Sequence, residues 1–237
     1  MRWLLLLGLL VSGSFAPAQT AAEISGEPHH RLLLENSEVR VFALALAPRE
    51  QAYVQHTHNF LFLPLQDGEL VLWSAGTSAV QHFLFHRGQV HFWLGARVGG
   101  MRNDGSATFR AVIVEFLNPK VTSYGYQYQS GTWDYGSGAI NAPVDPDAKF
   151  IDEMAIGAAS VADVQLLTAD TYPPPRKEAD ELLIAVPDLD LRANDDTLIH
   201  KASGDVLWIP AGRTWPLTNV AGTAARFTVV ALWKAGN

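Results

Sequence analysis

Short runs of apolar residues, several of them alternating with polar residues, follow one another along most of the chain. Alternation with a period of two is typical of strands with one buried face, and the helical period of 3.6 is scarce here. Turn-forming pairs such as Asp67-Gly68 and Asp104-Gly105 separate the runs. Many short strands at near-regular spacing predict an antiparallel sandwich or barrel. The predicted strands of the first half are 39–46, 58–65, 69–73, 82–85, 89–94 and 109–116.

The second half of the chain repeats the plan of the first. Residues 66–70 resemble residues 187–191 at an offset of 121 positions, and a shorter loop follows in the second copy. Shared spacing of glycine, asparagine and arginine, with apolar strands between them, predicts two tandem domains of one architecture. Three pairs share an offset of 116 positions: Gly88 with Gly204, Asn103 with Asn219, and Arg110 with Arg226.

Each pair carries its own expectation. The glycines are expected in turns that need a positive φ, and the asparagines are expected to fix loops through hydrogen bonds to nearby backbone. The arginines are expected on strand surfaces or in ion pairs between the barrels, with binding of an anionic substrate as the alternative.

The first 18 residues have the features of a secretory signal peptide. Arg2 gives a cationic start, an apolar run covers 4–11, and small residues at Ala16 and Ala18 end the segment. The apolar run is about half the length that spans a bilayer, so a retained anchor is not expected. We predict cleavage after Ala18 and a periplasmic or secreted protein with no membrane contact after cleavage.

Charge and cysteine content exclude further classes of function. The formal net charge is -7, and loss of Arg2 with the signal peptide makes it -8. Nucleic acids and anionic membranes bind proteins through clusters of Lys and Arg. This acidic chain has no basic run, so neither is an expected partner. The chain has no Cys, so it has no disulfide and no thiol chemistry. It also lacks a nucleophile elbow, a P-loop and a dinucleotide fingerprint.

An aromatic segment separates the two copies. Residues 124–136 include five large aromatic side chains, and exposing all of them to water would be unfavourable. We expect the segment to pack over one or both barrels, or to form an aromatic lip over a pocket. The predicted organisation is a signal peptide (1–18), an N-terminal barrel (19–120), an inter-barrel linker (121–157) and a C-terminal barrel (158–237).

The stretch from Gly204 to Asn219 resembles the second motif of the cupin barrels, G-x5-P-x-G-x2-H-x3-N. Trp215 stands where that motif has a metal-binding histidine, and Gly99 stands there in the first copy. Over about 30–118 and 158–234 the chain is similar to secreted bacterial bicupins. The resemblance implies an all-β fold of two tandem cupin barrels (double-stranded β-helices, or jelly rolls) with degenerate metal-binding motifs.

The first cupin motif supplies two histidines and a glutamate to a metal. His56-Thr57-His58 matches its His-x-His, and alternate residues of a strand share a face, so both imidazoles are expected to point into the first barrel. Phe62 or Leu63 takes the place of the glutamate. His91 could complete a rearranged site with His56 and His58 across a small barrel.

Two other interpretations of these histidines stay open. In one, His56 and His58 form a remnant site that binds a metal weakly or a substrate by hydrogen bonds. In the other, they are ordinary polar residues of a closed pocket. A metal in this barrel would be one divalent transition ion: iron, manganese, zinc or nickel. None is expected in the C-terminal barrel, where Lys177 and Ala179 replace the histidines.

Cupins include oxygenases, isomerases, decarboxylases, sugar-binding regulators and storage proteins, so the fold does not give the function. Our first hypothesis is an exported bicupin that binds a small organic ligand in its N-terminal barrel, with little or no conventional metal catalysis. Its expected lining residues are Phe62, Trp73 and Phe92. The alternative is a metal-dependent dioxygenase, lyase or isomerase of a small organic acid or sugar that uses His56 and His58. No catalytic residue is predicted, and a homodimer stays open.

Signal cleavage has a direct test. We expect the chain exported by a bacterial host to begin at Gln19, because small residues at 16 and 18 suit signal peptidase. Intact-mass spectrometry of the exported protein measures this. The variant Ala18→Arg should accumulate as the uncleaved precursor, and an exported chain that still begins at Met1 would contradict the prediction.

Overall fold

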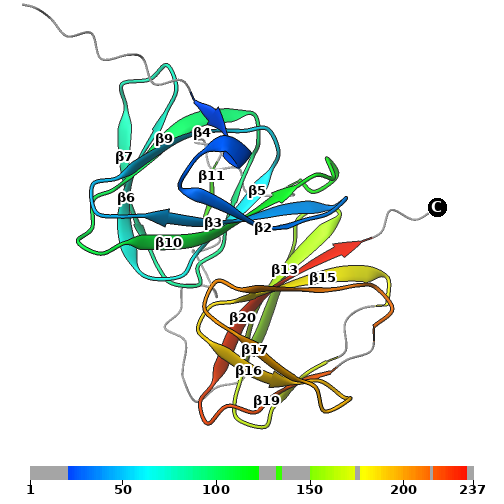
Figure 1. Ribbon diagram of the computed structural model, residues 1–237. Coiled ribbons are helices and arrows are strands. Elements are labelled where there is room, and N and C mark those ends of the chain that lie inside the picture. Colours follow the sequence, from blue (N-terminus) through cyan, green and yellow to red (C-terminus); the bar gives the residue numbers. More distant parts are fainter. Residues whose placement is uncertain (1–20, 123–131, 135–149, 174–176, 214–215, 234–237) are drawn as a thin grey trace, which may run out of the picture.

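The chain folds into two β-rich halves, shown by the computed structural model in Figure 1. The structure describes residues 21–122, 132–134, 150–173, 177–213 and 216–233. These residues form twenty strands and one 3-10 helix, η1 (Ile24–Gly26), which confirms the predicted all-β class. No helix in these ranges is long and apolar enough to cross a membrane.

Two sheets pack face to face in the first half. Their strand orders are β1-β4-β9-β6-β7 and β11-β8-β5-β10-β3-β2. They enclose an apolar cluster that includes Leu70 and Met101 from one sheet and Phe42, Phe62 and Ile113 from the other. The strands are β1 (Ala22–Glu23), β2 (His30–Glu35), β3 (Val39–Leu46), β4 (Gln51–His56), β5 (Phe60–Pro64), β6 (Gly68–Ser74), β7 (Val80–Phe85), β8 (His91–Trp93), β9 (Arg97–Asn103), β10 (Phe109–Phe116) and β11 (Thr132–Asp134).

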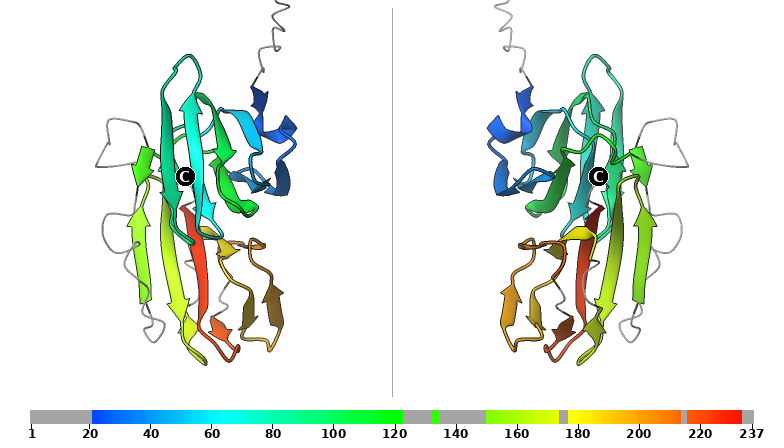
Figure 2. Two further views of the ribbon diagram at one scale, coloured as in Figure 1. Left: turned by 90° about the vertical axis from the view of Figure 1, so that its left-hand side faces the viewer. Right: turned by 90° about the vertical axis from the view of Figure 1, so that its right-hand side faces the viewer.

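The second half is built in the same way, and Figure 2 shows the halves one above the other, each as two layers. Its strand orders are β12-β13-β20-β15-β18 and β14-β19-β16-β17. An apolar cluster with Val164, Leu183 and Phe227 fills the space between these sheets. The strands are β12 (Phe150–Ala155), β13 (Ala159–Leu166), β14 (Thr171–Tyr172), β15 (Ala179–Ala185), β16 (Leu189–Arg192), β17 (Leu198–Lys201), β18 (Val206–Ile209), β19 (Leu217–Asn219) and β20 (Ala225–Trp233).

The strand pairing confirms that the second half repeats the first. Phe62 of β5 lies opposite Ile113 of β10, and Leu183 of β15 lies opposite Val229 of β20. The offsets between these equivalent residues are the predicted 121 and 116 positions. Because both pairs hold the same place in sheets of like order, the chain contains two copies of one β-sandwich.

Strands β10 and β20 are buried on both faces because the halves pack against each other. In β10, Ile113 faces the inside of the first half, whereas Val112 and Val114 join a core between the halves. In β20, Val229 faces the inside of the second half and Val230 joins the shared core. Burying each such side chain stabilises the fold by about 1.5–3 kcal/mol. The shared core therefore holds the two halves together.

Two equivalent turns add polar contacts between the halves. Gly88 and Gly204 have φ angles of 77° and 90°, in the left-handed region that glycine adopts at least cost. The guanidinium of Arg226 lies beside Gly88, so that a Cβ there would be 3.2 Å from its central carbon. In the mirrored contact, Arg110 donates a hydrogen bond to the carbonyl oxygen of Ser203 at 3.0 Å. Glycine at both turns therefore allows the two halves to approach each other closely.

Asn103 and Asn219 fix equivalent loops, as predicted. Asn103 donates to the carbonyls of Leu46 and Ala107 at 2.9 and 2.7 Å and accepts from the N–H of Gly105 at 2.9 Å. Asn219 makes the three equivalent hydrogen bonds at 3.1, 2.9 and 2.9 Å. Both residues are buried, so each side-chain amide makes the hydrogen bonds that water would otherwise make to three backbone groups.

One difference from the predicted strands changes the site. Strand β4 ends at His56 and β5 begins at Phe60, so His58 lies in the connection between them. The expectation that His56 and His58 alternate along one strand is therefore wrong. Strand β9 was not predicted, because Gly99 and Gly100 interrupt its apolar pattern.

The segment 121–157 contributes a strand to each half. Strand β11 pairs with β8 of the first half, and β12 pairs with β13 of the second. The rest of the aromatic stretch 124–136 lies outside the described residues, as does the predicted signal peptide. Packing of that stretch over a barrel stays a prediction.

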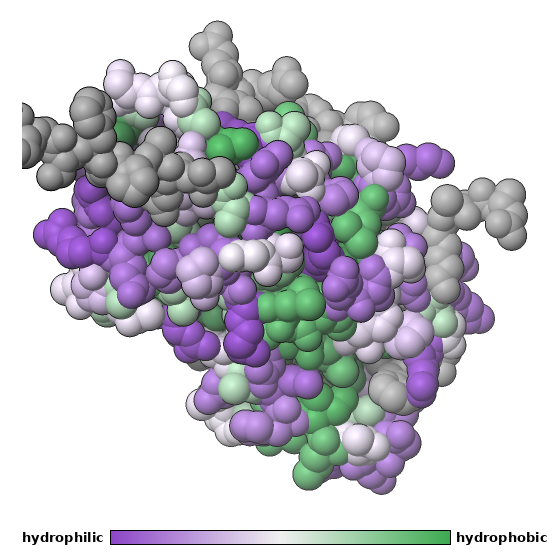
Figure 3. Space-filling model, turned by 45° about the horizontal axis from the view of Figure 1, so that its top comes forward, coloured by the Kyte–Doolittle hydropathy of each residue, from purple (hydrophilic) through white to green (hydrophobic). Residues whose placement is uncertain are grey.

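The surface is mostly hydrophilic over the first half, and an apolar strip runs down the second half in Figure 3. Among the described residues, the large apolar side chains with high exposure are Leu32, Val80, Leu84 and Leu198. Val80 and Leu84 belong to β7, a strand at the edge of its sheet. Edge strands are places where a second chain can pair, so a homodimer stays a prediction.

The two asparagines should contribute similarly to stability. We expect Asn103→Ala and Asn219→Ala each to lower the free energy of unfolding by about 2–4 kcal/mol, because each removes three hydrogen bonds from a buried loop. Asn118→Ala is the control, since it removes one bond, to the exposed N–H of Lys120. Urea denaturation measures all three, and a change at Asn103 or Asn219 no larger than that of the control would contradict the proposed loop-fixing role.

Candidate functional site

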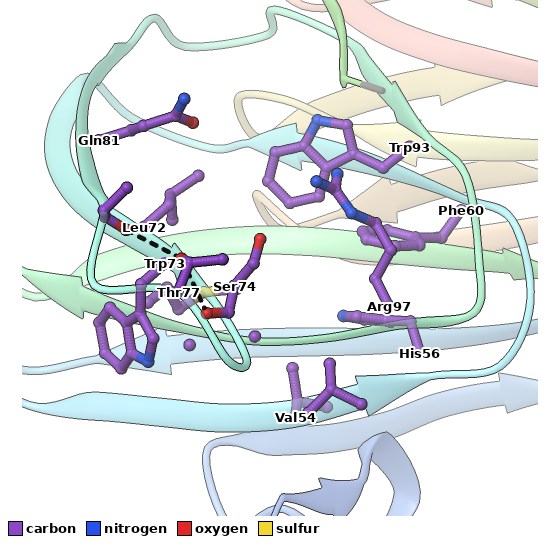
Figure 4. Close-up of a pocket in the computed structure, with 15 residues that line it drawn as sticks. Val54, His56, Phe60, Leu72, Trp73, Ser74, Thr77, Gln81, Trp93 and Arg97 are labelled. Atoms are coloured by element: carbon purple, nitrogen blue, oxygen red, sulfur yellow. Dashed lines mark hydrogen bonds between the residues drawn. The ribbon is translucent and has the colours of Figure 1, made fainter. Parts of the chain in front are cut away.

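A pocket of about 290 Å³ opens in the first half (Figure 4). Strands β4, β6 and β9 of the five-stranded sheet form most of its wall, and side chains from β5 and β8 of the facing sheet complete it. The lining residues are Val54, His56, Phe60, Leu72, Trp73, Ser74, Thr77, Ala79, Gln81, Trp93, Arg97, Val98, Gly99, Gly100 and Met101.

Strand register brings His56 and Arg97 together. They are opposite each other in the pairing of β4 with β9, so both side chains leave the sheet on the same face. Val54 and Gly99 form the next inward pair along the same two strands. In Figure 4 the imidazole of His56 extends beneath Phe60 and the side chain of Arg97. One histidine and one arginine therefore share this end of the pocket.

His56 is part of a buried polar network. Its Nδ1 lies 3.3 Å from Oε1 of Glu115, and the other oxygen of Glu115 lies 2.8 Å from Nη2 of Arg40. The carboxyl of Glu115 is fully buried, and only 14% of the Arg40 side chain is exposed. An unpaired buried charge would cost several kcal/mol, so the ion pair explains how this strand tolerates a glutamate.

The network fixes which nitrogen of His56 carries a proton. An ionised carboxylate can only accept hydrogen bonds, so Nδ1 of His56 donates to Glu115. Burial lowers the pKa of His56, an effect that the hydrogen bond to Glu115 opposes and that the nearby His30 and Arg97 reinforce. The ring is therefore neutral at pH 7, with its lone pair on Nε2.

Aromatic rings hold His56 in place. Its ring stacks on Phe60 with a centroid distance of 3.8 Å, and Phe60 in turn meets the edge of Trp93 at 5.2 Å. Such contacts restrict the rotamers of a histidine without engaging its nitrogens.

His58 lies near this network but outside the pocket lining. Its Nδ1 is 2.9 Å from Oγ1 of Thr57 and 3.4 Å from Nη2 of Arg40. It is half-buried, in the connection after β4.

His91 is also placed apart from the pocket lining. It is buried on β8, and its ring meets the edge of Phe85 at a centroid distance of 4.9 Å. The structure thus leaves His56 as the one predicted metal ligand that lines the described pocket.

The residues present do not fit a cupin-type metal site. Within the described ranges no three His, Cys, Asp or Glu side chains cluster in a way that could hold a metal ion, and such sites normally supply three or four protein ligands. Glu115 is already bound to Arg40. Gly99 faces the pocket, and a Cβ at this position would lie 2.5 Å from the carbonyl oxygen of Trp73. A histidine there would need the backbone to move.

The three predicted ligand-binding aromatics have different surroundings. Phe62 is fully buried and stacks on Trp93 and Phe109 rather than lining the pocket. Phe92 faces the core between the halves. Trp73 is among the lining residues, but its ring lies over Gly100 and points away from Arg97 in Figure 4.

The network of His56, Glu115 and Arg40 is not repeated in the described part of the second half. At the equivalent positions of the second half, Ser160 lies opposite Ala231, where the first half has Arg40 opposite Glu115. Lys177, which corresponds to His56, is exposed. Trp215 lies outside the described residues. Among the described residues of the second half, the buried ion pair is a different one, Arg226 with Asp163 at 2.7 Å, and the set of His56, Glu115 and Arg40 has no equivalent.

Solved structures with the same arrangement establish the architecture. AerE from Microcystis aeruginosa has a TM-score of 0.58 at 11% identity, covering 88% of this chain and 99% of that one. A cupin 2 conserved barrel domain protein from Leptotrichia buccalis gives 0.56 at 9%, covering 90% and 92%. The salicylate 1,2-dioxygenase from Pseudaminobacter salicylatoxidans gives 0.58 at 13%, covering 88% and 77%. The fold is that of a bicupin.

No family model and no curated protein sequence matches this chain. At identities of 9–13% the structural likeness establishes the architecture and nothing finer. The chemistry of the site has to come from the residues themselves.

Sequence reasoning missed Glu115, Arg40 and Arg97. A signal for two of them was present: Arg40 and Glu115 are charged residues within largely apolar strands, and Phe42 and Ile113, two positions away on the same faces, belong to the core. A charge in such a place is retained only when it is paired. Arg97 gave no such signal, because its strand was not predicted.

Stability should depend on pH through His56. The folded state holds this ring neutral below the ordinary histidine pKa of 6.5, whereas the unfolded state takes up a proton there. The free energy of unfolding therefore falls as pH drops from about 6.5 toward the lowered pKa, by at most about 1.4 kcal/mol per pH unit. His56→Gln should remove this part of the slope.

His200→Gln is a control of opposite sign. The hydrogen bond to Asp190 raises the pKa of His200, so its contribution is present below pH 6.5 and is lost as pH rises through the raised pKa. Denaturant titrations between pH 5 and 8 measure both variants. An unchanged slope in His56→Gln would show that the ring is not held neutral.

Proposed function

We propose that this bicupin binds a small organic acid in the pocket of its first half. The observation that carries the proposal is an apolar pocket with one positive side chain at its polar end. Export to the periplasm or outside the cell belongs to the same proposal and rests on the sequence of residues 1–18 alone.

The size and walls of the pocket support a small ligand. A volume of about 290 Å³ is just below the range for small-molecule sites, which is about 300–1,000 Å³, so the ligand has to be small. Most of the side chains that line it are apolar: Val54, Phe60, Leu72, Trp73, Ala79, Trp93, Val98 and Met101. They suit a ligand body that is mostly hydrocarbon or a single ring.

The charge at one end supports an acid over a neutral ligand. Arg97 brings a guanidinium to the pocket, and guanidinium groups bind carboxylates through parallel hydrogen bonds. Gln81, Ser74 and Thr77 add neutral polar groups. A structural neighbour, the salicylate 1,2-dioxygenase, has been solved with gentisate. At 13% identity this supports only the choice of salicylate and gentisate as first probes.

Methionine NMR can test binding. The predicted mature chain has two methionines, and of these Met101 lines the pocket whereas Met154 belongs to strand β12 of the second half. With ¹³C-methyl methionine, we expect small aromatic and aliphatic acids such as salicylate, gentisate and benzoate to shift the Met101 signal. The Met154 signal should stay in place.

A pocket-filling variant is the control. Ser74 is exposed at the rim, so Ser74→Phe should fold and weaken binding at least about tenfold by occupying the space. Ser37→Phe makes the same change in an exposed turn away from the pocket and should bind normally. Acids that leave Met101 unshifted, or that bind Ser74→Phe as well as the parent protein, would contradict the proposal. Stoichiometric iron, manganese, zinc or nickel that is lost in a His56→Ala, His58→Ala double variant would favour the metal-enzyme alternative.

A further inference from the structure

A buried nitrogen without a partner belongs to one of the residues that line the pocket. Nε2 of His56 is buried and makes no hydrogen bond, although Nδ1 of the same ring faces Glu115. Leaving a buried polar atom unpaired costs about 1–3 kcal/mol, and folded proteins rarely do so without a functional reason. Because His56 lines the pocket, a group that enters the pocket is the candidate partner for this nitrogen.

The tautomer described above determines what that group must be. With Nδ1 donating to Glu115, Nε2 presents a lone pair and can only accept a proton or a hydrogen bond. A histidine held by a carboxylate on one nitrogen, with the other nitrogen available to a ligand, is the arrangement of a general base.

We propose that His56 is a metal-independent acid–base group for the small organic acid bound in this pocket, with Glu115 and Arg40 as positioning residues. The proposal rests on the proposed function, since it needs an acid in the pocket. It adds a reaction class: reversible proton transfer to and from a C–H or O–H group of that acid.

The proton transfer balances without an oxidant, a reductant or a metal. The Nε2 lone pair takes the proton, an N–H bond forms, and the C–H or O–H bond breaks with its electrons left on the ligand. The imidazolium then faces the carboxylate of Glu115, and the new negative charge shares the pocket with Arg97. Return of the proton to the same atom gives exchange, and return to a neighbouring carbon gives isomerisation.

The network around the ring explains why two further residues are needed. Glu115 fixes the tautomer by accepting from Nδ1 of His56, and Arg40 holds the other oxygen of Glu115 at 2.8 Å. Arg97 and His30 also lie near His56 and disfavour a positive ring in the empty pocket. An acid bound at Arg97 would offset that repulsion when the ring takes a proton.

The chain contains a matched internal control. His30 also places Nδ1 on a carboxylate, that of Glu27, and its Nε2 is also buried without a hydrogen bond. His30 is absent from the pocket lining. A reagent that needs only a buried imidazole should modify both residues, whereas one that needs the pocket should modify His56 alone.

Affinity alkylation with bromoacetate tests the proposal. The Nε2 lone pair of His56 would displace bromide, forming an N–CH₂ bond while the C–Br bond breaks. We expect peptide mass spectrometry to find carboxymethyl-His56 and unmodified His30. Neutral bromoacetamide is the comparison reagent, and N-acetylhistidine gives the intrinsic ratio of the two rates. At His56 the bromoacetate-to-bromoacetamide ratio should exceed the intrinsic ratio by about tenfold, because the pocket carries a positive charge.

Two variants separate the role of Arg97 in attracting the anion from the role of Glu115 in fixing the tautomer of His56. Arg97→Gln should bring the ratio at His56 to within about twofold of the intrinsic ratio, since the attraction for the anion is lost. Glu115→Gln should slow alkylation at least about tenfold, because the amide no longer fixes the lone pair on Nε2. The ¹⁵N spectrum of the wild-type ring should show an Nδ1–H tautomer, and Glu115→Gln should show a mixture. If Glu115→Gln fails to fold, two measurements still test the acid–base role of His56. They are the tautomer of the wild-type ring and the bromoacetate-to-bromoacetamide ratio in Arg97→Gln.

The outcomes distinguish this proposal from the proposed function. Acetate that shifts the Met101 methyl signal, combined with bromoacetate that leaves His56 unmodified, would keep the binding pocket and overturn the acid–base role. An Nε2–H tautomer in the wild-type protein would overturn it as well. No shift at Met101 and no alkylation would overturn both. Selective alkylation at His56 that depends on Arg97 and Glu115 would support both.

Discussion

The packing of one half against the other is the contact on which the rest of the structure depends. Strands β5, β10 and β15, β20 send alternate residues into their own half and into the shared core, so neither half completes its burial alone. A small β-sandwich buries a limited fraction of its surface, and this chain has no disulfide to compensate. Duplication therefore supplies the apolar contact that keeps both copies folded.

Because the shared core stabilises the fold, the inside of the first half can tolerate polar groups. Arg40 and Glu115 occupy positions that apolar residues could fill, and a buried ion pair is weak evidence for added stability. The pair stands next to His56 and sets the proton position on that ring. The pair therefore matters more for the state of the histidine than as a source of stability for the sheet.

The two copies share their loop and turn contacts but differ in their buried polar residues. Asn103 and Asn219 keep the same three hydrogen bonds, and the turns at Gly88 and Gly204 keep the same contact between the halves. By contrast, Ser160 and Ala231 replace the ion pair in the second half. The loop-fixing residues are therefore common to both copies, whereas the Arg40–Glu115 pair beside a histidine is found only in the first half of the described structure.

The sequence by itself determined the fold class, the repeat and the loop-fixing residues, because these depend on local alternation, turn chemistry and spacing. It placed 39–46 and 109–116 at their observed limits as strands. Only the tertiary structure decided the site. The end of β4 at His56 separates it from His58, the unpredicted strand β9 brings in Arg97, and pairing across 59 residues joins His56 to Glu115. Contacts between distant strands follow from register and packing, which no short stretch of sequence encodes.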